Sequence, residues 1–125
     1  MEHRRNKLLC IDDHEVSLAG WCLYLQNAGY SVETARSAQE GLEVFATRPV
    51  DLVLLDYAMP EMNGGEVAAA MKRIKPDVRI VLFSGVSVPN RLRDHIDAFI
   101  VKGQPPAVVL NEIKRLLDGP AAATS

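Results

Sequence analysis

Five polar residues in the sequence each stand directly after, or at the end of, a short apolar run. Asp12 and Asp13 follow "KLLCI", Asp56 ends "DLVLLD", Ser84 follows "RIVLF" and Lys102 follows "AFIV". Two carboxylates 4 Å apart repel by about 4 kcal/mol at an effective dielectric near 20, so a group of them needs a cation. Oxygen ligands of this kind suit Mg²⁺. A carboxylate can attack phosphorus to give an acyl phosphate, a lysine supplies a mobile positive charge, and a serine supplies a hydroxyl donor.

Each of these residues also has an ordinary explanation when it is taken singly. Asp13 could cap the following helix, and Asp12 could be a solvated loop residue. Asp56 could be a turn carboxylate, and Ser84 before a glycine could be turn chemistry. Lys102 could be a surface lysine with a partly buried stem. The case for a joint role is therefore their shared position at strand ends.

The apolar runs alternate with amphipathic stretches along the whole chain. The helical stretches are "HEVSLAGWCLYLQNAG", "SAQEGLEVFATR", "GGEVAAAMKRIK", the short "VPNRLRDHI" and "PPAVVLNEIKRLLD". Ser37 and Glu40 predict a capping box, and Val67, Met71 and Ile74 are expected to face inward. Alternating strands and helices predict a doubly wound parallel sheet with helices on both faces. Ligands of such sheets bind beyond the carboxyl ends of the strands, where the polar residues above are expected.

Length and composition favour one globular domain. The chain has 125 residues, 24% of them charged and 48% hydrophobic, and a formal net charge of -2, so no broad field favours nucleic acid or a membrane surface. No apolar run approaches the roughly 20 residues of a membrane span. Cys10 and Cys22 match no ligand spacing and fit a reducing, cytoplasmic setting. We expect the domain to cover residues 1–118, with residues 119–125 a tail or a truncated linker.

Four motifs together resemble the receiver domains of bacterial two-component response regulators. They are "IDDHE", "LLDYAMPEMNG", "LFSG" and "AFIVKG", in the family's order and near its spacing. The resemblance covers the chain from Lys7 to about Leu117. It implies a flavodoxin-like (βα)5 three-layer sandwich with a parallel sheet of strand order 2-1-3-4-5.

The resemblance also implies a metal-dependent phosphoacceptor. Asp56 would accept the phosphoryl group, and Asp13 and Asp56 would bind Mg²⁺ directly. Asp12 would help through water, and the backbone carbonyl of Ala58 would be a further ligand.

Three residues would respond to the phosphoryl group according to the same resemblance. Ser84 would move to bond it, Lys102 would pair with it, and Phe99 would turn inward as the switch aromatic. The donor would be a phosphohistidine on a sensor kinase or a phosphotransfer protein, and the output a downstream protein or a fused domain, without direct contact to nucleic acid.

The sequence departs from the family pattern in several places. Only 17 residues separate Ser84 from Lys102, fewer than is usual, so we expect a fourth helix of about two turns. Gly103 stands where the family usually has a proline after a cis bond. A cis bond before another residue costs about 3–4 kcal/mol, so we expect trans. Phe99 lacks a phenolic hydroxyl, and the small Ala58 leaves the rim open, which suggests a short phosphoryl lifetime.

Competing functions are distinguished by single positions. A phosphatase with an aspartate nucleophile would carry a second aspartate where Ala58 stands. A nucleotide-binding domain would need a glycine-rich loop after the first strand. The chain is therefore expected to be a phosphoacceptor rather than an enzyme, with autodephosphorylation left open. A receiver-like domain that docks independently of phosphorylation stays as the alternative.

Overall fold

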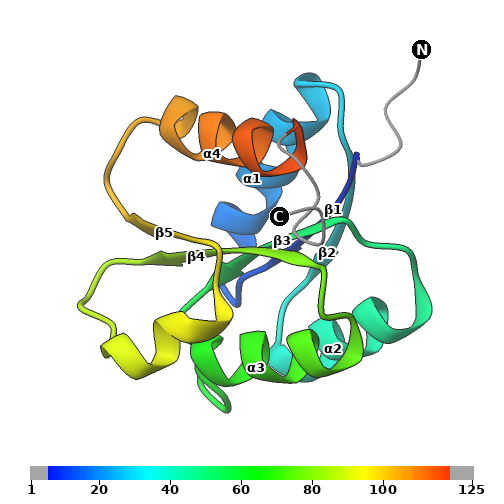
Figure 1. Ribbon diagram of the computed structural model, residues 1–125. Coiled ribbons are helices and arrows are strands. Elements are labelled where there is room, and N and C mark those ends of the chain that lie inside the picture. Colours follow the sequence, from blue (N-terminus) through cyan, green and yellow to red (C-terminus); the bar gives the residue numbers. More distant parts are fainter. Residues whose placement is uncertain (1–5, 119–125) are drawn as a thin grey trace.

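The alternation of apolar and amphipathic segments produces a three-layer α/β sandwich (Figure 1). The computed structural model describes residues 6–118, so the predicted tail lies outside the described residues. All strand pairs are parallel, and the strand order is β2-β1-β3-β4-β5, as the family resemblance implied. The strands are β1 Lys7–Ile11, β2 Ser31–Ala35, β3 Leu52–Asp56, β4 Arg79–Ser84 and β5 Ala98–Val101.

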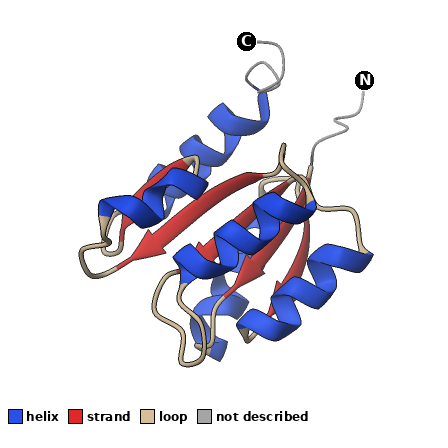
Figure 2. Ribbon diagram, turned by 60° about the horizontal axis from the view of Figure 1, so that its bottom comes forward, coloured by secondary structure: helices blue, strands red, loops and turns tan. Residues whose placement is uncertain are grey.

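Helices cover both faces of this sheet. Two pack on one face, and two helices with a short 3₁₀ segment pack on the other (Figures 1 and 2). The first face carries α1 Glu15–Asn27 and α4 Pro106–Asp118. The second carries α2 Ala38–Thr47, α3 Gly64–Ile74 and the 3₁₀ segment η1 Asn90–His95. No helix within residues 6–118 is both long and apolar enough to cross a bilayer.

The central strand β3 is buried along its whole length, which explains its continuous apolar sequence. Its side chains alternate between the two faces, as they must in any strand. Val53 and Leu55 pack on the α2 and α3 side, whereas Leu52 and Leu54 pack on the α1 and α4 side. Asp56 continues the second set, so its carboxylate projects from the sheet face that α1 and α4 cover.

The helix α3 corrects one part of the predicted core. Val67 and Met71 are fully buried, but Ile74, the last residue of α3, is 48% exposed. The helix begins with a capping box that the sequence analysis missed. The Asn63 side chain accepts from the Glu66 backbone N–H, and the Glu66 carboxylate accepts from the Asn63 backbone N–H.

The predicted capping box of α2 forms only in half. The Ser37 hydroxyl accepts from the Glu40 backbone N–H at 3.0 Å. The Glu40 carboxylate accepts from the Arg36 backbone N–H instead of reaching back to Ser37. The Glu40 side chain thus bonds the backbone N–H of Arg36, one residue before the N-cap Ser37.

The segment predicted as a shortened fourth helix is short, but it is a 3₁₀ helix rather than an α-helix. Its six residues pack closely on α3: a Cβ added at Gly65 would lie 2.8 Å from Leu92 Cβ. Asp97 follows the segment and pairs with Lys72 of α3 at 3.0 Å, while its carboxylate accepts from the Ile80 backbone N–H. Short 3₁₀ turns are common where a connector has little length, which fits the few residues available here.

Candidate functional site

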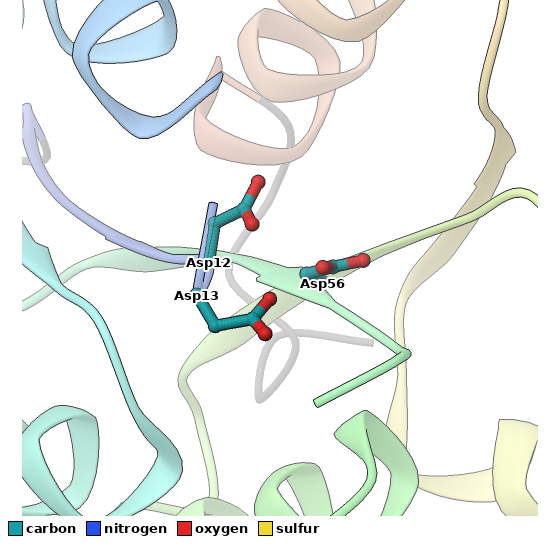
Figure 3. Close-up of side chains that lie close together, drawn as sticks. All are labelled: Asp12, Asp13 and Asp56. Atoms are coloured by element: carbon teal, nitrogen blue, oxygen red, sulfur yellow. The ribbon is translucent and has the colours of Figure 1, made fainter. Parts of the chain in front are cut away.

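Three aspartates meet at the carboxyl edge of the sheet (Figure 3). Asp12 and Asp13 follow β1, and Asp56 ends the adjacent β3. One carboxylate oxygen from each residue lies within 4.8 Å of the other two. The structure therefore brings together the three carboxylates that the sequence placed at strand ends.

The three carboxylates have different surroundings. Asp12 and Asp56 are buried, with 6% and 5% exposure, whereas Asp13 is exposed. Asp12 accepts a hydrogen bond of 2.9 Å from the His14 backbone N–H at the start of α1. Asp13 was the residue that could have capped this helix, but the N-cap position is His14, which has no capping side-chain bond. Asp13 thus keeps its carboxylate available on the open side of the cluster.

Lys102 reaches Asp56 from the loop after β5. Its ammonium nitrogen lies 3.0 Å from Asp56 Oδ1. The pair is an ion pair outside ordinary hydrogen-bond geometry, since Oδ1 has no hydrogen-bond partner among the described residues. The carboxylate is buried, while the lysine side chain is 38% exposed. One acceptor oxygen is therefore held near a positive charge without being fully occupied.

Burial is the largest influence on the pKa of Asp56. Loss of hydration raises the pKa of the Asp56 carboxyl above its ordinary value of 3.8, and the negative charge of Asp12 acts in the same direction. Lys102 and the backbone N–H of Ala58 lower the pKa but do not outweigh burial. A cation beside Asp56 would favour its charged form.

The donor set fits a hard divalent cation. Only oxygen atoms are offered, from two buried carboxylates and one exposed carboxylate, and Mg²⁺ prefers such ligands together with water and phosphate. The predicted roles of Asp12, Asp13 and Asp56 toward the metal stay predictions, and so does that of the Ala58 carbonyl. Ala58 is exposed, which is consistent with the open rim expected from its small side chain.

Ser84 lies near the site but is turned to its own loop. Its side chain is buried at the end of β4. The hydroxyl donates to the Val86 carbonyl at 2.8 Å and accepts from the Val86 backbone N–H at 3.0 Å. This is the turn interpretation, and a bond from Ser84 to a phosphoryl group would require the hydroxyl to leave Val86.

Phe99 lies on the other sheet face from the carboxylates. It is half-buried against the cluster that α3 and η1 complete, and the Arg93 guanidinium stacks 4.3 Å from the centre of its ring. Its predicted role as a switch aromatic stays a prediction.

The expected trans bond between Lys102 and Gly103 is confirmed, because none of the described peptide bonds is cis. Gly103 has a φ of 101°, which a glycine adopts without strain.

Two aromatic residues beside the site were not singled out from the sequence. Phe83 lies under the ammonium of Lys102, whose nitrogen is 5.5 Å from the ring centre. Trp21 of α1 packs perpendicular to Phe83, with ring centres 5.5 Å apart. Both line a small cavity of about 10 Å³ together with Asp12 and Asp56. The period-two alternation of β4 could have indicated that Phe83 shares a sheet face with Val81, but its place beside Asp56 depends on the sheet register.

Comparison with known proteins agrees with this geometry. Residues 8–114 match the family described as the response regulator receiver domain. The transcriptional regulatory protein GlrR of Escherichia coli (strain K12) is 31% identical over 99% of this chain, which spans 29% of GlrR. The autoinducer 1 sensor kinase/phosphatase LuxN of Vibrio campbellii is 33% identical over 88% of this chain, which spans 13% of LuxN. The chain thus covers less than a third of either relative.

Solved structures give the same result. A CheY-like receiver domain protein from Methanospirillum hungatei has a TM-score of 0.87 and 28% identity, with 90% of this chain and 94% of that chain covered. The response regulator TrrA from Thermotoga maritima, in complex with Mg²⁺ and BeF, has a TM-score of 0.85 and 30% identity, with 90% and 99% covered. The motifs, the sheet order, the acidic cluster and these matches together lead to one conclusion: the chain belongs to the response regulator receiver domain family.

Proposed function

We propose that this receiver domain accepts a phosphoryl group on Asp56 in a Mg²⁺-dependent reaction and thereby changes a protein-docking surface. The observation that carries the proposal is the position of Asp56. Its carboxylate ends the central strand, lies 3.0 Å from the Lys102 ammonium and shares a 4.8 Å cluster with Asp12 and Asp13. A buried acceptor, a cation site and a positive charge for the phosphate thus meet at one point.

The transfer can be written with these residues in named roles. An oxygen of the ionised Asp56 attacks phosphorus, the new O–P bond forms, and the N–P bond to the donor imidazole breaks as the imidazole takes up a proton. A bound Mg²⁺, held by Asp13, Asp56, the Ala58 carbonyl and, through water, Asp12, would neutralise the charge that gathers on the phosphoryl oxygens. Lys102 orients the phosphoryl group through its ammonium.

Ser84 and Phe99 are the residues we assign to the response. Ser84 would exchange its bonds with Val86 for a bond to the phosphoryl group. A hydrogen bond to a charged group contributes about 1.5–3 kcal/mol, so one such bond shifts an equilibrium roughly 10- to 150-fold. Phe99 would then repack beside η1 and β5, on the surface that we expect to dock a partner.

The partners are proposed as classes. The donor is a sensor histidine kinase or a phosphotransfer protein, and the output is a downstream protein or a fused domain, in the cytoplasm and without direct contact to nucleic acid. GlrR is named as a transcriptional regulator and LuxN as a sensor kinase/phosphatase, so domains of this kind occur in both settings. We assign the receiver domain to residues 1–118 and a tail or linker to residues 119–125.

A docking domain that works without phosphorylation is the second candidate. Two observations favour it. The Ser84 hydroxyl is fully engaged with Val86, and the usual fourth helix is reduced to a six-residue 3₁₀ segment. Either feature would weaken the link between the acceptor and the surface.

Intact-mass measurement after incubation with Mg²⁺ and acetyl phosphate tests the proposal. The wild-type protein should gain one phosphoryl group, and Asp56→Asn should gain none. Asp77→Asn, a change at an exposed aspartate outside the cluster, should behave like the wild type. The bound group should be lost quickly, because the exposed Ala58 leaves a path for water. No gain in the wild type, with acetyl phosphate or with a phosphohistidine donor, would favour the docking alternative.

A further inference from the structure

Lys102 and Asp56 come from strands that are not neighbours. The strand β4 lies between β3, which ends at Asp56, and β5, which leads into Lys102. Neighbouring strands are about 4.8 Å apart, so the side chains of Lys102 and Asp56 together must span roughly 9–10 Å across β4. Whatever residue β4 places at this level forms the surface over which the side chain passes.

At the level of Asp56 that residue is Phe83, whereas the Lys102 stem itself lies against Gly85, where an added Cβ would be 3.8 Å from Lys102 Cδ. In the sheet register Asp56 is the partner of Phe83 on one side, and Ile100 is its partner on the other. Partners in a parallel pair project to the same face, so Phe83 lies between the carboxylate and β5 on the face that carries Asp56. The lysine nitrogen is 5.5 Å from the ring centre and 3.0 Å from the carboxylate oxygen.

The ring is itself held in place. Trp21 packs against Phe83 with the two ring planes at 87°, and Tyr24 packs against Trp21 at 83°. Perpendicular aromatic pairs at these separations are favourable beyond their buried area. The aromatic row therefore fixes the Phe83 ring more firmly than an aliphatic side chain would be fixed.

The side chain of Lys102 is free to adopt several conformations unless a neighbouring residue restrains it. Its side chain is 38% exposed, and Gly103 follows it with a positive φ. A lysine has four rotatable side-chain bonds and loses about 2 kcal/mol of rotamer entropy when it is fixed. Among the described residues, the Lys102 ammonium contacts the Asp56 carboxylate and the Phe83 ring.

We propose that Phe83, held perpendicular to Trp21, is a positioning residue that keeps the Lys102 ammonium beside Asp56. The ring attracts the ammonium through its negative face and guides the side chain across β4. The inference deepens the proposed function, on which its kinetic consequence rests. The placement of Lys102 itself can be measured without any phosphoryl transfer.

The experiment compares Phe83→Leu, which keeps an apolar side chain but loses the ring, with Phe83→Tyr, which keeps the ring. In NMR spectra of the full chain, the terminal methylene protons of Lys102 should show a ring-current shift in the wild type and in Phe83→Tyr. In Phe83→Leu that shift is lost with the ring, so the placement of Lys102 is measured there by nuclear Overhauser contacts between its terminal methylene protons and the Asp56 methylene protons, which should weaken. The rate of phosphorylation by acetyl phosphate should fall about two- to fivefold in Phe83→Leu and stay near wild type in Phe83→Tyr. The Mg²⁺ affinity should stay unchanged in both.

The outcomes separate the inference from the proposed function. Unchanged contacts between Lys102 and Asp56 in Phe83→Leu would overturn the inference, and so would a Phe83→Tyr protein as slow as Phe83→Leu. A wild type that takes up no phosphoryl group would refute the proposed function, but the Lys102 signals would still decide the placement. If Phe83→Leu does not fold, Phe83→Met replaces it, and the same two measurements apply.

Discussion

Replacing Asp56 by asparagine should stabilise the protein at neutral pH when Mg²⁺ is removed. The pKa of Asp56 is raised in the folded state, chiefly by burial. A group with a raised folded pKa contributes stability below its unfolded pKa, and that contribution is lost as the pH rises through the folded pKa. Wild-type stability should therefore fall above the ordinary value of 3.8, while asparagine removes this loss.

The charges around Asp56 explain why burial decides the direction in which its pKa is shifted. The Asp12 and Asp56 oxygens lie within 4.8 Å, so their repulsion is at least about 3.5 kcal/mol at an effective dielectric near 20. Lys102 at 3.0 Å attracts Asp56 by about 5.5 kcal/mol at the same dielectric, but its exposure screens that attraction. The two interactions oppose each other, and the lost hydration of a carboxylate with 5% exposure is the largest cause and gives the pKa shift its direction.

Thermal unfolding followed by circular dichroism, in a chelator from about pH 4 to about pH 7, tests this reasoning. The Asp56→Asn protein should melt above the wild type by an amount that grows with pH. A gain of about 1 kcal/mol would raise Tm by roughly 3–5 °C in a chain of this size. Saturating Mg²⁺ should reverse the order, since a ligand at 100 times its Kd stabilises by about 2.7 kcal/mol and Asp56→Asn binds it less tightly.

Asp77→Asn is the matched control, because it removes one exposed carboxylate outside the cluster. Its Tm should follow the wild type at every pH. The reasoning would be refuted if Asp56→Asn lowered Tm in the chelator, or if its advantage did not depend on pH. Equal stabilisation of both proteins by Mg²⁺ would show that the cation binds elsewhere.

Three further substitutions and one labelling experiment probe the packing of the fold. Lys72→Met should lower the free energy of unfolding by about 1–3 kcal/mol in urea denaturation, because it leaves the half-buried Asp97 without its ion pair; an unchanged value would mean that solvent replaces the lysine. Gly64→Ala should lower it by about 1–3 kcal/mol, since the added Cβ would lie within 3.0 Å of backbone that follows β3. Gly20→Ala, in open space on α1, should instead raise it by about 0.5–1 kcal/mol; equal effects at the two glycines would contradict the packing argument. Cys10 is buried and its pKa is raised to about 12, so iodoacetamide at about pH 8 should leave it unmodified until the protein unfolds, and its labelling in the native protein by intact mass would speak against this burial.

The sheet and the acidic cluster could be predicted because both depend on local pattern. The continuous apolar run that leads to Asp56 requires a strand covered on both faces. A parallel sheet then brings the ends of its strands to one edge, and the strand order that the family resemblance implied, with β1 beside β3, places Asp12 next to Asp56. These conclusions did not need any tertiary detail.

The side-chain partners could not be predicted in the same way. Ser84 could have bonded the cluster or its own loop, and the choice of Val86 depends on the backbone path after β4. Ile74 fits the inward period of α3, but it is the last residue of that helix and is 48% exposed. Phe83 lies beside Asp56 because of the register between β3, β4 and β5, and this register could not be read from the sequence alone.

The charge balance of the site suggests how phosphorylation would be read. Three carboxylates face one ammonium, a formal net charge of -2 that a divalent cation would cancel. A phosphoryl group brings about 1.5–2 negative charges and consumes only the one on Asp56, so excess charge remains after transfer. Ser84 is the nearby donor that could meet this excess, and it can do so only by releasing Val86, whose side chain is 60% exposed. We therefore expect the loop between β4 and η1 to move first, before Phe99 or any partner surface responds.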